Sequence, residues 1–423
     1  MTAHARLLAA AALALATVGV AAAARAEQRW LVAVATSERL AKVWREGNVE
    51  DGREAGRSFV AITTDGRGSP SLVAAQGLAA DARGRFVKVA LRVHGMAHLA
   101  NLQVRAGGAD FERSWFSLPV PIYADLEYNF LQDGEWAAVT LPFGSADVAG
   151  TPDRARLDTL GIMATDDGRA PVRIDVAGIA LVDAPREGVV SITFDDGYKE
   201  HLAAARAMAA RGWRGTAYVI PQVLGTRPAY LTLDDVREIG RLGFDVAAHD
   251  DPPFTQIPAD ALEPRVRGIQ RFLAEHGFAE GARHLAYPLG KQEPKRVRPT
   301  VARLFATARI AGGGPETLPP ADPHLLRAVN VVAGTKPEQV GVWARRAKEQ
   351  GEWLILMLHW LPETTAQHTD YAMADYLAML GEIAKSGARV APVTEVWKEA
   401  APLVAAHPAF APSAAAPAKA ASR

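Results

Sequence analysis

The chain has 423 residues, of which 49% are hydrophobic and 22% are charged. A chain of this length is usually too long to fold around a single hydrophobic core, so we expect two domains. Lysine plus arginine and aspartate plus glutamate each total 47, so net charge gives no reason to expect binding to nucleic acid or to an anionic membrane. Because cysteine is absent, disulfides, thiol nucleophiles and thiolate metal sites are excluded, and any metal must be bound by oxygen and nitrogen.

Residues 1–26 have the pattern of a secretory signal peptide. A basic start with His4 and Arg6 precedes an apolar stretch over 7–18, and the small-x-small sequence at 24–26 suits cleavage before Glu27. The alternative is an N-terminal membrane anchor, but the apolar run is shorter than the ~20 residues needed to span a bilayer. We therefore expect an exported protein, periplasmic or secreted, with no transmembrane segment in the mature chain.

Residues 27–186 have the pattern of an all-β domain. Short β-runs are separated by turn residues such as Asp-Gly and Gly-Gly pairs. The segment 86–93 alternates apolar with polar or small residues, as a strand with one buried face does. The predicted strands are 30–35, 59–63, 86–93, 136–141 and 172–181. The pattern predicts a β-sandwich or jelly roll.

Residues 187–400 alternate short apolar strands with amphipathic helices, which is typical of a parallel α/β fold. The predicted strands are 189–193, 216–219, 244–248, 285–287, 328–332, 354–358 and 390–391, and the clearest helices are 199–211, 233–242 and 336–349, the last begun by a Thr335-x-x-Glu338 capping box. These repeats predict a closed or nearly closed α/β barrel with its active site at the carboxyl ends of the strands. Residues 401–423 are rich in Ala and Pro, which predicts a disordered tail.

Two adjacent carboxylates, Asp195 and Asp196, follow the first barrel strand and precede a helix. One can bind a cation while the other accepts a proton from water, which is the chemistry of metal-assisted hydrolysis. The alternative is an Asp-Gly turn with a helix N-cap.

Two further strand ends carry polar residues. His249, Asp250 and Asp251 follow the strand 244–248, and His359 follows 354–358. A single histidine is more often structural than a ligand, but the strand ends of a barrel converge at one mouth. Three polar strand ends therefore predict one shared site.

The sequence Thr-Phe-Asp-Asp-Gly at 193–197 is identical to the first motif of the polysaccharide deacetylases of carbohydrate esterase family four, also called the NodB-homology domain. The chain resembles this family over about 188–400. The resemblance implies a deacetylase barrel in which Asp195 is the catalytic base and Asp196 binds a divalent metal. It also implies that His249, which matches the first histidine of the second motif, is a metal ligand.

The second motif then departs from the family pattern, because its second histidine is missing and Asp250, Asp251 and two prolines occupy that stretch. Either aspartate could replace the imidazole and give an Asp/His/Asp site, or the metal is held loosely or not at all. We expect substitution by an aspartate. Zinc is the leading expectation, with manganese, cobalt and nickel as alternatives.

Other motifs match less closely. The segment 286–290 resembles a Tyr-Pro-Tyr-Gly element, which implies that the Leu289 amide helps to hold the oxyanion. The segment 356–359 resembles the last motif, which implies that Leu356 shapes the acetate pocket and that His359 protonates the departing amine. Arg327 is the candidate for a family arginine that orients the base.

The all-β region resembles the carbohydrate-binding jelly rolls that accompany glycan enzymes. Its aromatic residues Trp44, Trp115, Tyr123, Tyr128 and Trp136 could stack on sugar rings, although core packing is the more common fate of such side chains.

Together these features predict a metal-dependent hydrolase of carbon–nitrogen bonds other than peptide bonds, which removes N-acetyl groups from an extracellular or cell-envelope polysaccharide. Two alternatives stay open. The chain could be a catalytically impaired deacetylase-fold protein that binds glycan, or a deacylase of another acyl sugar or amide.

Overall fold

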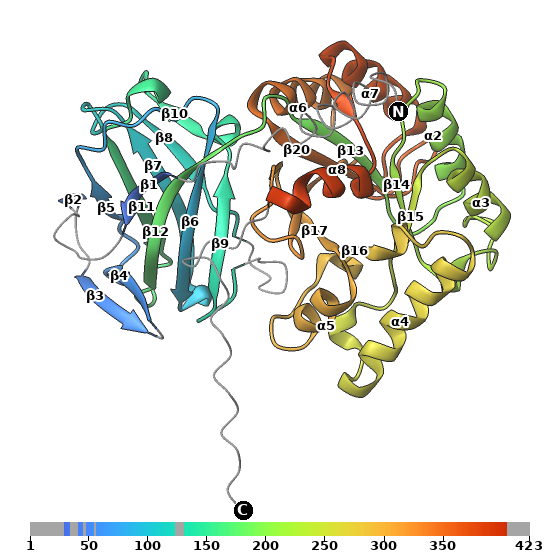
Figure 1. Ribbon diagram of the computed structural model, residues 1–423, viewed down its shortest axis with the longest axis horizontal. Helices are drawn as coiled ribbons and strands as arrows, with labels where there is room; N and C mark the ends of the chain where they lie inside the picture. Colours follow the sequence, from blue (N-terminus) through green and yellow to red (C-terminus); the bar gives the residue numbers. More distant parts are fainter. Residues whose placement is uncertain (1–28, 34–40, 45–47, 55, 123–130, 404–423) are drawn as a thin grey trace, which may run out of the picture.

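The computed structural model describes residues 29–33, 41–44, 48–54, 56–122 and 131–403. An antiparallel two-sheet domain lies beside an α/β barrel (Figure 1). The predicted signal peptide and most of the predicted tail lie outside the described residues, but 401–403 of that tail form a short 3-10 helix. No helix in the described ranges is both long enough and apolar enough to span a membrane.

The two-sheet domain contains two six-stranded sheets, and all of their pairings are antiparallel. The first sheet has the order β3-β4-β12-β6-β9, with β1 also on β12, and the second has the order β10-β8-β7-β11-β5-β2. All five predicted strands are present here. The strands are β1 (Arg29–Ala33), β2 (Ala41–Trp44), β3 (Asn48–Glu54), β4 (Arg57–Thr63), β5 (Ser71–Ala75), β6 (Arg85–His94), β7 (Leu99–Gly107), β8 (Trp115–Pro119), β9 (Trp136–Leu141), β10 (Asp147–Ala149), β11 (Thr159–Asp166) and β12 (Arg173–Asp183).

The inner faces of the two sheets share one core. Val89 and Leu91 from the first sheet and Val104 and Ile162 from the second belong to the same buried cluster. Alternate residues of a strand point to opposite faces, and Val87, Val89, Leu91 and Val93 of the predicted strand 86–93 all belong to this core. Burying each such side chain stabilises the fold by about 1.5–3 kcal/mol.

Seven parallel strands close the barrel, in chain order from β13 to β20, and β20 pairs back onto β13. They are β13 (Val189–Phe194), β14 (Thr216–Val219), β15 (Asp245–Ala248), β16 (His284–Ala286), β17 (Thr307–Gly313), β19 (Leu326–Asn330) and β20 (Glu352–Leu358). Two short strands lie outside the ring: β18 (Glu316–Thr317) pairs antiparallel with β20, and β21 (Arg389–Val390) pairs with β13. The closed barrel predicted from the sequence is therefore confirmed.

One barrel strand differs from the prediction. The predicted strand at 390–391 corresponds to β21, which is outside the closed ring, and β17 takes the remaining place in the ring. The sequence Thr-Ala-Arg-Ile-Ala-Gly-Gly of β17 contains a charge and two glycines, so it lacks the apolar run that marks a buried parallel strand.

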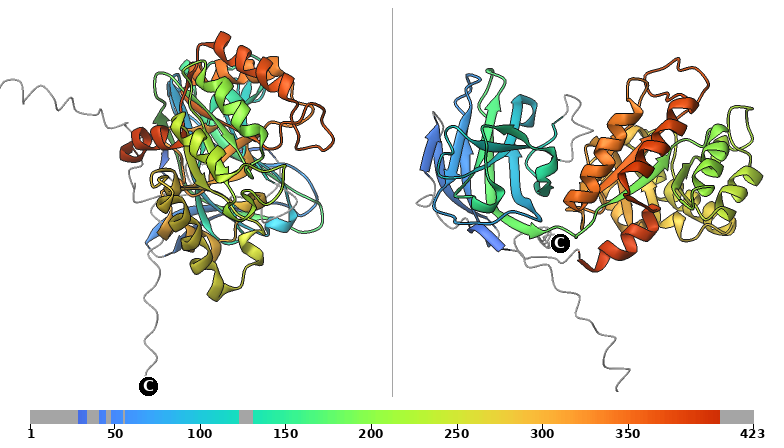
Figure 2. Two further views of the ribbon diagram at one scale, coloured as in Figure 1. Left: turned by 90° about the vertical axis from the view of Figure 1, so that its right-hand side faces the viewer. Right: turned by 90° about the horizontal axis from the view of Figure 1, so that it is seen from above.

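Helices surround the barrel (Figures 1 and 2). They are α2 (Glu200–Ala209), α3 (Leu233–Arg241), α4 (Ala259–Glu275), α5 (Val297–Leu304), α6 (Pro337–Gln350), α7 (Met373–Ser386) and α8 (Val393–Ala400). The capping box predicted for α6 is wrong, because the Thr335 hydroxyl accepts from the Val332 amide and does not cap the helix. A capping box does begin α3, between Thr232 and Asp235.

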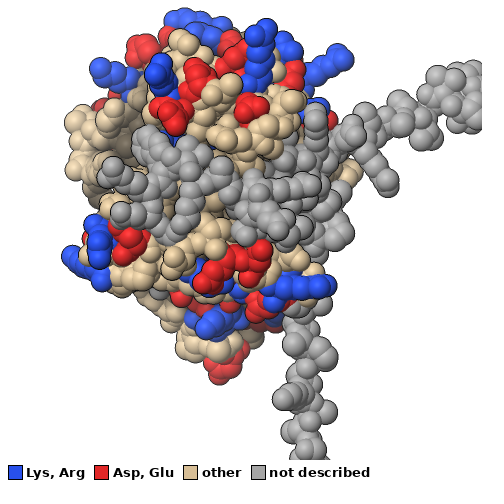
Figure 3. Space-filling view, turned by 90° about the vertical axis from the view of Figure 1, so that its left-hand side faces the viewer, with Lys and Arg blue, Asp and Glu red and all other residues tan. Residues whose placement is uncertain are grey.

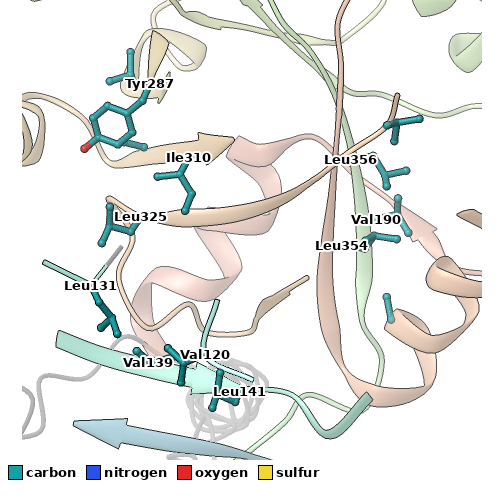
Figure 4. Close-up of a cluster of buried hydrophobic side chains, with 14 of the residues drawn as sticks. Val120, Leu131, Val139, Leu141, Val190, Tyr287, Ile310, Leu325, Leu354 and Leu356 are labelled. Atoms are coloured by element: carbon teal, nitrogen blue, oxygen red, sulfur yellow. The ribbon is translucent and has the colours of Figure 1, made fainter. Parts of the chain in front are cut away.

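Arg327 lies where the barrel meets the two-sheet domain. Its guanidinium donates to Glu316 Oε1 at 2.7 Å and to the Thr140 carbonyl at 2.8 Å, and Glu316 and Arg327 are 2% and 5% exposed. Leu325 of the barrel and Val139 of β9 also belong to one continuous apolar cluster (Figure 4). The prediction that Arg327 orients the catalytic base is therefore wrong, since the residue joins the two domains.

We expect Arg327→Ala to lower the free energy of unfolding by about 3 kcal/mol, because Glu316 keeps a buried charge that has lost its partner. Any catalytic activity that the folded molecule shows should stay unchanged. Urea unfolding tests the first expectation, with Arg83→Ala as the control because its pair with Asp81 is exposed. A change in activity without a change in stability would contradict this interpretation and support a role of Arg327 in the active site.

Candidate active site

The barrel mouth brings together four of the predicted site residues. Asp195 and Asp196 follow β13, His249 follows β15, and His359 follows β20. Backbone hydrogen bonds fix these ends, since the Asp195 amide donates to the Leu358 carbonyl at 2.9 Å and the His249 amide donates to the Val219 carbonyl at 3.1 Å. The convergence expected from parallel strand ends is thus present.

Asp196 and His249 form a close pair. His249 Nε2 lies 3.3 Å from Asp196 Oδ1, while His249 Nδ1 donates to the Ala286 carbonyl at 2.8 Å and so holds the ring with Nε2 toward the carboxylate. Asp196 has φ 74°, a left-handed conformation that few non-glycine residues adopt. Burial raises the pKa of Asp196, but the hydrogen bond from His249 and the nearby His249, His359 and His201 lower it below its ordinary value overall.

Neither candidate for a third metal ligand joins this pair. Arg265 of α4 donates to both Asp250 oxygens, at 2.7 and 2.8 Å, and the Asp251 amide donates to Asp250 as well. Asp251 is exposed. Among the described residues, no three His, Asp or Glu side chains are placed to hold a metal ion.

The predicted Asp/His/Asp site is therefore not formed, because the Asp250 carboxylate is committed to Arg265. Catalytic zinc usually has three protein ligands and one open position. Asp196 and His249 supply only two donors, so the described residues do not fit such a centre.

A buried arginine that the sequence did not reveal holds Asp195. Arg309 of β17 donates from Nη2 to both Asp195 oxygens, at 2.5 and 2.6 Å, and both residues are nearly inaccessible to solvent. The guanidinium also lies over the Tyr218 ring. Arg309 rather than Arg327 is therefore the arginine that pairs with Asp195. The only sign of it in the sequence is the single charge inside the otherwise uncharged segment 307–313.

Leu356 does not lie in the mouth. It belongs with Val190 and Leu354 to the apolar layer that also includes residues of the surrounding helices (Figure 4). Met357 lies on the opposite face, and its Sδ contacts Arg309 Nη1. Residues two apart on a strand share a face, so Met357 rather than Leu356 is on the side of His359.

Leu289 lies in the short 3-10 helix η9 (Pro288–Gly290) after β16. Its φ is 54° and its side chain is 61% exposed, which is unusual for leucine. No acceptor for its amide is present in the part of the chain that the structure describes. This amide is therefore free to donate to a ligand, and its role as an oxyanion donor stays a prediction.

His201 of α2, which the sequence did not single out, supports His359. Its Nε2 donates to the His359 carbonyl at 2.7 Å, and its ring packs on Phe194 with centroids 5.0 Å apart. Burial lowers the pKa of His201 to about 4, so this ring is neutral at pH 7. His359 Nδ1 has no hydrogen-bond partner among the described residues.

Two tryptophan side chains of the two-sheet domain pack against arginine side chains. Arg57 and Arg92 lie over the Trp136 ring, and Arg105 lies over Trp115. The side chain of Trp44 and all of Tyr123 and Tyr128 lie outside what the structure describes. These contacts agree with packing as the role of Trp136 and Trp115.

Scans of the sequence against protein-family models and against curated proteins find no match. Among solved structures, the family 4 carbohydrate esterase from Streptomyces lividans is 18% identical, covers 48% of this chain and 88% of its own, and has a TM-score of 0.33. The Bc1960 peptidoglycan N-acetylglucosamine deacetylase is 11% identical, with coverage of 51% and 91% and a TM-score of 0.37. The chitin deacetylase from Colletotrichum lindemuthianum is 13% identical, with coverage of 50% and 88% and a TM-score of 0.34. At these identities and scores, the similarities assign neither activity nor ligand to this chain.

We expect His201→Leu to lower the free energy of unfolding by about 1–3 kcal/mol, because the His359 carbonyl loses its donor. His201→Gln should lose less stability, since its amide can donate to the same carbonyl.

The unfolded chain binds a proton at His201 at higher pH than the native chain does. Wild-type stability should therefore fall as pH drops from about 6.5 toward about 4, and His201→Gln should lack this part of the pH dependence. Urea unfolding at several pH values measures both effects, and equal losses in the two variants would exclude a role for the hydrogen bond.

We expect Asp250→Asn to bind zinc with unchanged affinity, because its carboxylate faces Arg265 and not His249. Asp196→Ala and His249→Ala should each lose whatever zinc binding the wild type shows. Calorimetric zinc titration of the three variants checks this. Loss of zinc binding in Asp250→Asn at unchanged stability would show that Asp250 is a ligand and support the predicted Asp/His/Asp site.

Proposed function

We propose that the chain is a polysaccharide N-deacetylase, a hydrolase that removes N-acetyl groups from an extracellular or cell-envelope glycan. The observation that carries the proposal is the placement of Asp195 and His359 at adjacent strand ends of a closed barrel, beside the Asp196–His249 pair. The signal-peptide pattern supports an exported protein, periplasmic or secreted.

The residues of the mouth can divide the chemistry among them. Asp195, held by Arg309, can take a proton from water, because an ionised carboxylate keeps lone pairs beyond those that an arginine occupies. The Leu289 amide can donate to the oxyanion that forms on the acetamide. His359 can give a proton to the departing amine.

The proposal does not require a divalent metal, and experiment must decide whether the chain binds one. With two protein donors in place, a cation at Asp196 and His249 would need water or substrate oxygens to complete its coordination. No step above depends on it.

The second candidate function is glycan binding without catalysis. The Asp250–Arg265 ion pair favours it, because that pair removes the residue expected to complete the metal site.

We expect purified mature protein to release acetate from N-acetylated oligosaccharides, and Asp195→Asn and His359→Gln to lower kcat by at least about 100-fold each. Metal content by mass spectrometry is measured on the same samples, with Asp196→Ala and His249→Ala. Asp251→Asn is the matched control, since its side chain is exposed and outside the pair.

Three outcomes separate the alternatives. Acetate release that depends on Asp195 and His359 supports the deacetylase. No acetate, even after metal is added back, with glycan binding retained supports the second candidate. Release of a different acid or amine identifies a deacylase of another substrate.

A further inference from the structure

We propose that Trp360, Tyr198 and Tyr230 form a saccharide-binding subsite at the rim of the barrel mouth, which takes a pyranose ring of an N-acetylated glycan next to the reacting unit. These three residues are called the rim row below. The inference rests on the proposed function and says where its substrate is held.

The rim row is a continuous stack of rings. The Trp360 and Tyr198 rings have centroids 6.1 Å apart at an interplanar angle of 25°, and the Tyr198 and Tyr230 rings have centroids 5.5 Å apart at 18°. Trp360 directly follows His359, and Tyr198 is two residues after Asp196. The row therefore begins beside the catalytic candidates and leads away from them.

The backbone around the rim row is fixed before any ligand binds. Tyr198 and Tyr230 form an isolated antiparallel bridge, with the Lys199 amide donating to Ala229 at 2.9 Å and the Leu231 amide donating to Gly197 at 2.9 Å. A preformed surface loses less conformational entropy on binding than a mobile one.

Trp360 is held at the other end of the row. Its Nε1 donates to Glu200 Oε2 at 3.1 Å, and its carbonyl accepts from the Tyr371 amide at 3.0 Å. The indole is therefore fixed in orientation next to His359.

The row keeps groups that a sugar can use. All three side chains are half-buried, and neither tyrosine hydroxyl has a hydrogen-bond partner within the described residues. Tyr198 is stacked between its two neighbours, so the end rings Trp360 and Tyr230 are the ones that can contact the apolar C–H face of a pyranose. The hydroxyls can bond its polar rim. Uncharged rings with two available hydroxyls suit a neutral sugar.

The two-sheet domain offers no comparable surface among its described residues. Arginine covers its tryptophan rings, as noted above, and its outward face carries intermixed basic and acidic side chains in the visible part of Figure 3. The described features therefore favour the barrel rim as the place for sugar stacking.

The test is calorimetric titration of the full mature chain with N-acetylglucosamine and its trimer. Trp360→Ala should weaken trimer binding by about tenfold, the size of one aromatic contact, while monomer binding changes little. Trp360→Phe should retain much of the affinity. The double variant Tyr198→Phe/Tyr230→Phe should weaken trimer binding by about three- to tenfold with an unchanged Tm.

Trp343→Ala is the matched control. Trp343 is a half-buried tryptophan on α6 that packs on the core, so its loss should lower Tm and leave trimer affinity unchanged. Each variant is checked for folding by its thermal melt.

The outcomes distinguish this inference from the proposed function. Trimer binding that depends on Trp360 without acetate release would support the subsite and sink the hydrolase. Acetate release with the same KM in wild type and Trp360→Ala would overturn the subsite and leave the hydrolase standing. Absence of any glycan binding in the wild type would overturn the subsite.

Discussion

Closure of the barrel by the pairing of β20 with β13 is the constraint on which the site depends. Six consecutive residue pairs align the two strands, from Val189 with Trp353 to Phe194 with Leu358. The residues that follow both strands, Asp195 and His359, are adjacent because of this register. A one-residue slip would turn every side chain of a strand to the other face, so the alternating apolar layers on both sides of β20 hold the register.

The same closure explains which parts of the site could be predicted from the sequence. Asp195, Asp196, His249 and His359 each follow an apolar strand, and strand ends of a parallel barrel meet without any knowledge of side-chain contacts. Local order along the chain was enough for these residues. The Leu289 amide belongs to the same class, because it follows β16.

The ion pairs of the site depend on contacts between residues far apart in the chain, which the sequence pattern does not reveal. Asp250 is paired with Arg265, 15 residues later on a helix, and Asp195 is paired with Arg309, 114 residues later on a strand that lacks an apolar run. A charge in a strand can point into the barrel or toward another domain, as Arg309 and Arg327 respectively do. Leu356 and Met357 likewise point to opposite faces of β20. The face that each one takes can be assigned only when the position of the strand in the barrel is known.

The ion pair between Asp250 and Arg265 also limits how this site could change. A histidine at position 250 would leave the Arg265 guanidinium without the carboxylate that it contacts in the present chain, so the change would lower the stability of the fold. Removing Arg265 alone would leave a buried aspartate unpaired. A three-ligand metal centre is therefore separated from the present chain by at least two coupled substitutions, each unfavourable by itself, so the present ligand set is expected to persist under single-residue change.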